Sequence, residues 1–174
     1  MNKKTSIARL SIISNSSLIV LKLIVGLLTG SVSIISEAIH STMDLAAAII
    51  AFFSVKVSSI PADENHPYGH GKVENISGVI EAVLIFIASA WIIYEAVLKI
   101  MSPSKIESAG IGFLIMIISS IVNFLVSRKL YKVAEEEDSI ALKADALHLK
   151  ADVYTALGVG IGLLLIWVTK IYFL

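Results

Sequence analysis

The sequence predicts an all-α protein, a polytopic bundle of membrane-spanning helices, and three observations support this fold class. Apolar and aromatic residues (the set AVILMFWYC) make up 56% of the 174 residues, charged residues make up 16%, and mean hydropathy is +0.86. Soluble domains carry about 25% charged residues. Five stretches are long and apolar enough to cross a bilayer, which takes roughly 20 helical residues. None of them shows the short alternating strands of a membrane β-barrel, which is the other structure that satisfies all its backbone hydrogen bonds in lipid.

The five predicted spans follow one another through short polar connections. Their approximate ranges are 10–29, 34–57, 76–98, 109–130 and 140–171. The connection after the second span contains Pro67, Gly69 and Gly71, which favour a shaped loop over a flexible tether. The fifth span is longer than a bilayer requires and is polar in its first half. No soluble domain is evident, so we expect residues 1–174 to form a single transmembrane domain.

The distribution of basic residues predicts the orientation of the bundle. The first apolar run lacks the small-residue cleavage pattern of a signal peptide, so we expect it to be retained as a span. Cytoplasmic connections carry an excess of Lys and Arg. With the N-terminus in the cytoplasm, that side carries Lys3, Lys4, Arg9, Lys56, Lys72, Arg128, Lys129, Lys132 and Lys143, and the other side carries Lys99, Lys105 and Lys170. The sequence therefore predicts a multi-pass protein of the cell membrane with a cytoplasmic N-terminus.

Charge and cysteine content exclude several classes of function. Lys plus Arg and Asp plus Glu each number 14, so the net charge is 14 − 14 = 0. This balance disfavours nucleic-acid binding, which requires a basic surface. The chain has no cysteine, which excludes disulfides, thiolate zinc sites and cysteine nucleophiles.

Two spans carry the same pair of metal-binding side chains. His40 and Asp44 in the second span, and His148 and Asp152 in the fifth, are each separated by four residues, which places each pair on one helix face. Ionisable groups in hydrocarbon cost at least about 2.5–3.5 kcal/mol each on insertion scales, so they require a reason. A single such pair is as readily a hydrogen-bonded His–Asp contact. Two copies facing each other would offer two nitrogens and two carboxylates, a set that suits tetrahedral Zn²⁺.

The loop after the second span offers a further, more exposed ligand set. Asp63, His66 and His70 have the residue types of a metal site, and we predict a second site there. From the spacing alone, a polar turn on the cytoplasmic side is the more common explanation.

Other polar residues in the spans give weaker signals. They include Asn15, Lys22, Glu81, Glu95 and Asn123, which would line a water path or, more commonly, form hydrogen-bonded helix contacts. Glu37 and Asp145 each lie three residues before a histidine of the four-ligand set and are placed to orient its imidazole.

Three motifs, in order along the chain, resemble those of the cation diffusion facilitator family. They are Ser36-Glu37-Ala38-Ile39-His40-Ser41-x-x-Asp44, His66-Pro67-Tyr68-Gly69-His70-Gly71-Lys72-x-Glu74 and Asp145-Ala-x-His148-x-x-x-Asp152. Members of this family are proton-coupled exporters of divalent transition metals. The resemblance implies a transport site at His40, Asp44, His148 and Asp152, a loop site at Asp63, His66 and His70, and a homodimer.

The resemblance also implies parts that this sequence does not contain. Family members have six spans and a cytoplasmic C-terminal domain, whereas this chain ends after what resembles the fifth span. We therefore expect a truncated form of a longer protein, with a naturally short member as the alternative.

The function that we expect is export of a divalent metal, most simply Zn²⁺, in exchange for protons. Metal binding requires neutral imidazole and ionised carboxylate, so protons and metal compete for one site. The metal is substrate and not cofactor, and Fe²⁺, Co²⁺, Cd²⁺, Mn²⁺ and Ni²⁺ are open alternatives. A membrane scaffold that binds metal without transport is a second possibility. We do not expect an enzyme, because a metallohydrolase needs an open coordination position and four protein ligands leave none.

Overall fold

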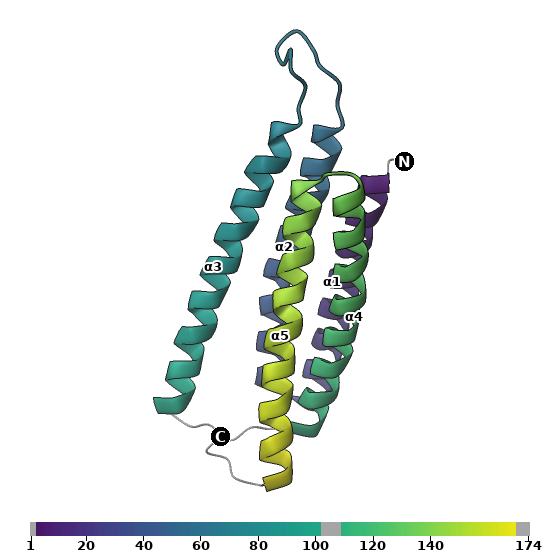
Figure 1. The fold of residues 1–174 in the computed structure, drawn as a ribbon. Coiled ribbons are helices and arrows are strands. Elements are labelled where there is room, and N and C mark those ends of the chain that lie inside the picture. The colour runs from purple at the N-terminus through teal and green to yellow at the C-terminus, as the bar shows by residue number, and fades with distance from the viewer. Residues whose placement is uncertain (1–2, 102–108, 170–174) are drawn as a thin grey trace.

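Five helices, connected in antiparallel fashion, account for the predicted spans (Figure 1). The computed structural model describes residues 3–101 and 109–169, and within these ranges it contains no strand. The helices are α1 (Lys3–Thr29), α2 (Val32–Ser58), α3 (Lys72–Met101), α4 (Ala109–Glu136) and α5 (Ile140–Thr169). The all-α prediction is therefore confirmed.

The outside of the bundle is apolar, as expected for a protein whose solvent is lipid. Within the described residues, α1, α2, α3 and α4 each contain a segment long and apolar enough to cross a membrane. Large apolar side chains on their outer faces are exposed, including Leu27, Leu28 and Phe86 at 72%, 82% and 76%. Exposed apolar area of this extent is unusual on a soluble monomer and is the normal exterior of a membrane bundle. A membrane crossing by α5 stays a prediction.

Helix ends extend beyond the apolar stretches that define the predicted spans. The helix α1 begins at Lys3 and α4 continues to Glu136, whereas the predicted spans begin at residue 10 and end at residue 130. The extra turns are stabilised by ion pairs of Glu136 with Lys3 and, at 3.9 Å, with Lys132. The chain then reverses at Asp138, whose φ is 48°, and Ser139 Oγ accepts a hydrogen bond of 3.4 Å from the Leu142 N–H at the start of α5.

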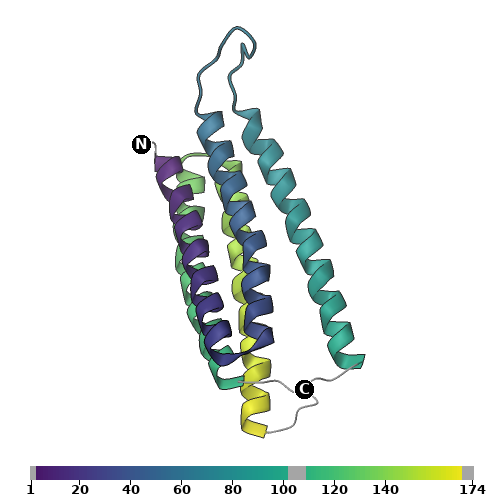
Figure 2. The ribbon, with the colours of Figure 1, turned by 180° about the vertical axis from the view of Figure 1, so that it is seen from behind.

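The helices pack as two antiparallel pairs with α3 at their side. Figures 1 and 2 show α1 and α2 on one side of the bundle and α4 and α5 on the other, which agrees with the extensive contacts within each pair. The α4–α5 pair encloses the apolar core around Leu130, Leu142 and Leu149, all 0% exposed. The Ser127 hydroxyl of α4 also donates a 2.7 Å hydrogen bond to the Ala146 carbonyl of α5.

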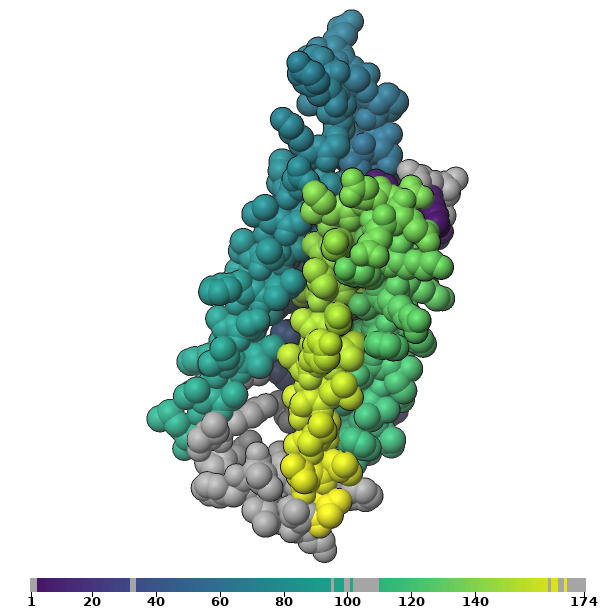
Figure 3. All heavy atoms as spheres, in the orientation of Figure 1, coloured from purple at the N-terminus to yellow at the C-terminus, as the bar shows by residue number. Residues whose placement is uncertain are grey.

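One end of the bundle holds the start of α1, the α2–α3 loop (59–71) and the α4–α5 connection (137–139), and we call it the loop end (Figure 1). At the opposite end α3 leans away from the other helices, so its contacts with α2 and α5 lie toward the loop end (Figures 1 and 3). If the predicted orientation is correct, the loop end faces the cytoplasm.

The α1–α2 pair depends on a glycine at its closest approach. A Cβ atom added at Gly26 would lie 2.7 Å from Ile35 Cγ1 and 3.2 Å from the Ile35 backbone nitrogen. The chain turns between the two helices at Gly30, whose φ of 66° favours glycine. A side chain at position 26 therefore forces the two helices apart.

We predict that Gly26→Ala lowers the free energy of unfolding by about 1–3 kcal/mol, the usual cost of overpacking. Gly158→Ala is the matched control, because no described atom lies within 4 Å of an added Cβ there and alanine favours helix by about 0.5–1 kcal/mol. Unfolding by SDS in mixed micelles measures both. Equal loss of stability in the two variants would contradict the close-approach argument.

Candidate metal centre

Three of the four predicted transport ligands meet between α2 and α5. His148 Nε2 lies 3.2 Å from Asp44 Oδ1 and 3.8 Å from Asp152 Oδ2. One ligand atom from each of Asp44, His148 and Asp152 lies within 4.8 Å of those of the other two. We call this group the buried trio. It arises because His148 and Asp152 are one turn apart on α5, and Asp44, near the middle of α2, faces them.

The buried trio is shielded from solvent and contains nitrogen and oxygen atoms that have no hydrogen-bond partner. The side chains of His148, Asp44 and Asp152 are exposed by only 5%, 10% and 22%. His148 Nδ1 and Asp152 Oδ2 are buried without a hydrogen-bond partner. Unsatisfied polar atoms are rare in folded proteins, and each one calls for an explanation. A cation bound among His148 Nε2 and the two carboxylates would satisfy Asp152 Oδ2 and compensate the carboxylate charge.

The fourth predicted ligand, His40, lies outside the buried trio. Its side chain is half-buried, and it is not in the group whose ligand atoms lie within 4.8 Å of one another. It is one helical turn from Asp44 and farther from the loop end, on the same side of the trio as Asp152. Ligation by His40 therefore stays a prediction.

A buried lysine of α1 lies beside the site. Lys22, only 4% exposed, donates a hydrogen bond of 2.7 Å to Ser41 Oγ and forms a 3.3 Å ion pair with Glu37. Glu37 thus pairs with Lys22, whereas we expected it to be placed to orient His40. The positive charge lies within electrostatic range of Asp152. The sequence left two explanations for Lys22, a water path and a hydrogen-bonded helix contact. The structure has the second of these, which is also the commoner one.

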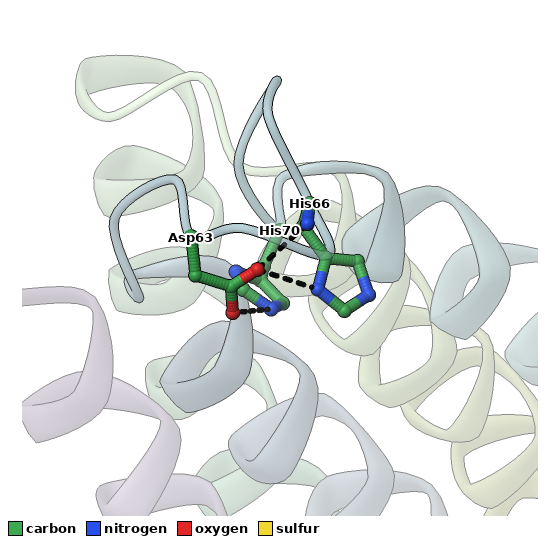
Figure 4. A group of neighbouring side chains, drawn as sticks. All are labelled: Asp63, His66 and His70. Atoms are coloured by element: carbon green, nitrogen blue, oxygen red, sulfur yellow. Dashed lines mark hydrogen bonds and ion pairs between the residues drawn. The ribbon is translucent and has the colours of Figure 1, made fainter.

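The loop residues Asp63, His66 and His70 also come together (Figure 4). Asp63 Oδ1 lies 3.0 Å from His66 Nδ1, Asp63 Oδ2 lies 3.6 Å from His70 Nε2, and the two rings are 4.2 Å apart. The side chains of Asp63 and His66 are about half exposed, whereas His70 is 12% exposed. We call these three residues the loop trio, and it is much wetter than the buried trio.

A tight turn shapes the loop trio. Asp63 and His66 exchange backbone hydrogen bonds of 3.2 Å. The N–H of Gly69, a residue whose φ is 77°, donates a 2.9 Å hydrogen bond to the His66 carbonyl. Desolvation raises the pKa of Asp63, but hydrogen bonds from the backbone and ring of His66, together with the charges of His66 and His70, outweigh it, so this pKa lies below its ordinary value. The carboxylate is therefore ionised at neutral pH and available to a cation.

One residue of the second motif has a structural role that the sequence did not indicate. Glu74, 6% exposed near the start of α3, accepts hydrogen bonds from Ser58 Oγ at 2.7 Å and from Ser139 Oγ, and pairs with Lys4 at 3.3 Å. It thereby ties α1, α2 and α3 to the start of α5 at the loop end. Its partners are far away in sequence, which is why spacing alone could not identify them.

A membrane bundle that buries metal-binding side chains between two helices has the architecture of a metal transporter. Comparison with known proteins agrees, because residues 8–173 match the cation efflux transmembrane domain. The chain therefore belongs to the cation efflux, or cation diffusion facilitator, family, whose members transport metal ions as substrates.

Individual relatives support the same assignment. An uncharacterized transporter of Synechocystis is 39% identical over 82% of this chain and 46% of its own length. Magnetosome protein MamB of Magnetospirillum gryphiswaldense is 31% identical over 81% and 48%, and cation-efflux pump FieF of Shewanella oneidensis is 27% identical over 91% and 53%. The chain thus spans about half the length of the curated relatives it matches.

We predict that Asp152→Ala lowers zinc affinity by roughly 100-fold or more, because removal of a ligand should exceed the 10–100-fold cost of outer-shell changes. His66→Ala with His70→Ala should change affinity at the buried trio by about twofold or less, because distant sites are nearly independent. Calorimetry measures both, with Glu135→Ala, an exposed acidic residue of α4, as the control. An unchanged affinity in Asp152→Ala would exclude this residue as a ligand.

Proposed function

We propose that this protein exports a divalent transition metal, preferentially Zn²⁺, across the cell membrane in exchange for protons. The observation that carries the proposal is the buried trio, in which two carboxylates and one imidazole from facing helices meet near the middle of a membrane bundle. Membership in the cation efflux family supports metal transport in general. Zinc, proton exchange and this ligand set are the finer parts of the proposal.

Proton exchange follows from the chemistry of the trio. Without metal, His148 Nε2 contacts both Asp44 and Asp152, so a proton on this nitrogen would be stabilised by two carboxylates. With metal bound, the same nitrogen and oxygens would be occupied by the ion. Imidazole changes its charge near neutral pH, so metal and proton displace each other over the range in which a proton gradient operates.

The preference for zinc rests on ligand type. Imidazole nitrogen and carboxylate oxygen in a four-coordinate site are typical of zinc. The buried trio supplies three such ligands, and we propose that His40 completes the set when metal binds. If water held the fourth position in place of His40, Fe²⁺, Co²⁺, Cd²⁺, Mn²⁺ and Ni²⁺ would compete with Zn²⁺ more effectively. The reason is that ligand type and geometry decide selectivity within this series.

Orientation and assembly are further parts of the proposal. The excess of basic residues supports a cytoplasmic loop end, with the N-terminus on the same side. The resemblance of the motifs supports a homodimer in which each protomer has its own transport site. A scaffold that binds metal without moving it is the second candidate, because the buried trio accounts for binding of a metal but not by itself for its movement.

Flux through reconstituted vesicles tests the function directly. We expect zinc entering proteoliposomes to be matched by proton movement in the opposite direction, and to slow when an ionophore collapses the pH gradient. Asp152→Ala supplies the inactive control in the same lipid. Zinc binding without flux would contradict export and favour the scaffold.

Replacing His40 tests the proposed fourth ligand. His40→Asp changes the proposed set to one nitrogen and three carboxylates, and carboxylate suits Mn²⁺ better than imidazole does. We predict that the variant still binds Zn²⁺ but discriminates less against Cd²⁺ and Mn²⁺, measured by competition binding with paired metals. Ser36→Asp, on the exposed outer part of the same helix, adds an equal charge without the ligand change and serves as the control. An unchanged order of preference would place His40 outside the coordination sphere.

A further inference from the structure

A second pair of buried carboxylates lies near the buried trio and takes no part in it. Glu81 of α3 and Asp145 of α5 are both 0% exposed and lie within electrostatic range of each other. Glu81 Oε1 accepts a 3.1 Å hydrogen bond from Ser77, but Glu81 Oε2 and both carboxylate oxygens of Asp145 have no hydrogen-bond partner. The hydroxyl of Ser11 on α1 faces Asp145 without completing a hydrogen bond.

Two buried acidic groups with unsatisfied oxygens require compensation. A buried charge without a partner is strongly unfavourable, and more so in a membrane. Among the described residues, neither Glu81 nor Asp145 forms an ion pair with Lys or Arg, in contrast to Glu37 and Glu74. A proton on each carboxyl group or a cation shared between the two groups would supply that compensation.

The pair lies between the loop end and the buried trio. Asp145 precedes His148 by three residues, which is one turn nearer the loop end on the same face of α5. Glu81 follows Glu74 by seven residues, so both buried side chains lie on the face of α3 that meets the bundle. The two helices come very close here, since a Cβ added at Gly78 would lie 3.0 Å from Ile140 Cγ2.

The loop end of this α3–α5 contact opens into a cavity. The cavity has a volume of about 350 Å³ and is lined by polar residues from several elements. They include Lys4, Ser58, Glu74, Asn75 and Asp138. From this cavity toward the centre of the bundle, the buried acidic residues follow in the order Glu74, then Glu81 with Asp145, then the buried trio.

We propose that Glu81 and Asp145 form a second cation station, made of oxygen ligands only, which holds the divalent metal between the loop-end cavity and the buried trio. The role of the station in transport rests on the proposed export function, whereas its ability to bind a cation does not. Carboxylate and hydroxyl oxygens bind hard divalent cations and lack the imidazole that favours zinc. The station therefore binds zinc more weakly than the trio does, which allows the ion to move on.

Counting bound Mn²⁺ by electron paramagnetic resonance tests the station apart from transport. The starting protein carries Asp152→Ala, His66→Ala and His70→Ala in lipid nanodiscs, so that the buried trio and the loop trio are both disabled. We expect one bound Mn²⁺ per chain in this background. Adding Glu81→Gln or Asp145→Asn, which preserve side-chain volume, should abolish that binding, whereas adding Glu81→Asp or the exposed control Glu135→Gln should retain it.

Two results of the Mn²⁺ count would overturn the station. One is a background protein that binds no Mn²⁺, and the other is a bound ion that survives both Glu81→Gln and Asp145→Asn. In the otherwise unsubstituted protein, Glu81→Gln should lower the rate of zinc flux several-fold at low zinc while calorimetric zinc affinity at the buried trio is unchanged. Flux equal to that of the unsubstituted protein would also contradict the station. Absence of flux in the unsubstituted protein contradicts export instead, and the Mn²⁺ count then decides the station alone.

Discussion

The contact between His148 and Asp44 is the interaction on which the centre of this bundle depends. It joins the α1–α2 pair to the α4–α5 pair through groups that hydrocarbon would otherwise exclude. Among the described residues, Asp44 has no side-chain partner within its own pair, and His148 has there only Asp152, at 3.8 Å. The closer contact of 3.2 Å therefore forms only when the two pairs face each other in this register. Around the contact, Asn15 donates to the Asp44 carbonyl at 3.4 Å, and Lys22 satisfies Ser41 and Glu37. The polar centre therefore specifies the packing of helices whose outer faces are otherwise alike.

The sequence predicted the fold class well because its cause is local. Length and hydropathy of each stretch determine whether it can cross a bilayer, and neither depends on the rest of the fold. Helix ends were predicted less well, since turns beyond the apolar stretch are stabilised by partners elsewhere in the chain. Glu136 extends α4 by pairing with Lys132 on its own helix and with Lys3 at the other end of the sequence. The predicted end of the fourth span, at residue 130, therefore lies short of the end of α4 at Glu136.

The candidate site was predictable in its ligand types but not in its grouping. The spacing of four residues places His148 and Asp152 on one face, and the structure has them so. The same spacing gave no means of separating His40 from Asp44, because side-chain direction depends on neighbouring helices. Glu74 shows the same limit, since its role depends on cross-helix contacts with Lys4, Ser58 and Ser139. Spacing within one helix carries no information about such contacts.

The arrangement in two pairs also determines which distances can change. His148 and Asp152 share α5, so their separation is set by the helix, whereas Asp44 approaches them from the other pair. Sliding or tilting one pair against the other would therefore alter the Asp44–His148 distance and leave the α5 ligands together. At the loop end, Glu74 ties both pairs through Lys4, Ser58 and Ser139. Separation of the helices at the loop end would break these contacts and leave the Glu74 carboxylate to be satisfied by water or by a cation. Under the export function proposed above, a cation that replaced these partners at Glu74 would link its own admission to movement of the helices.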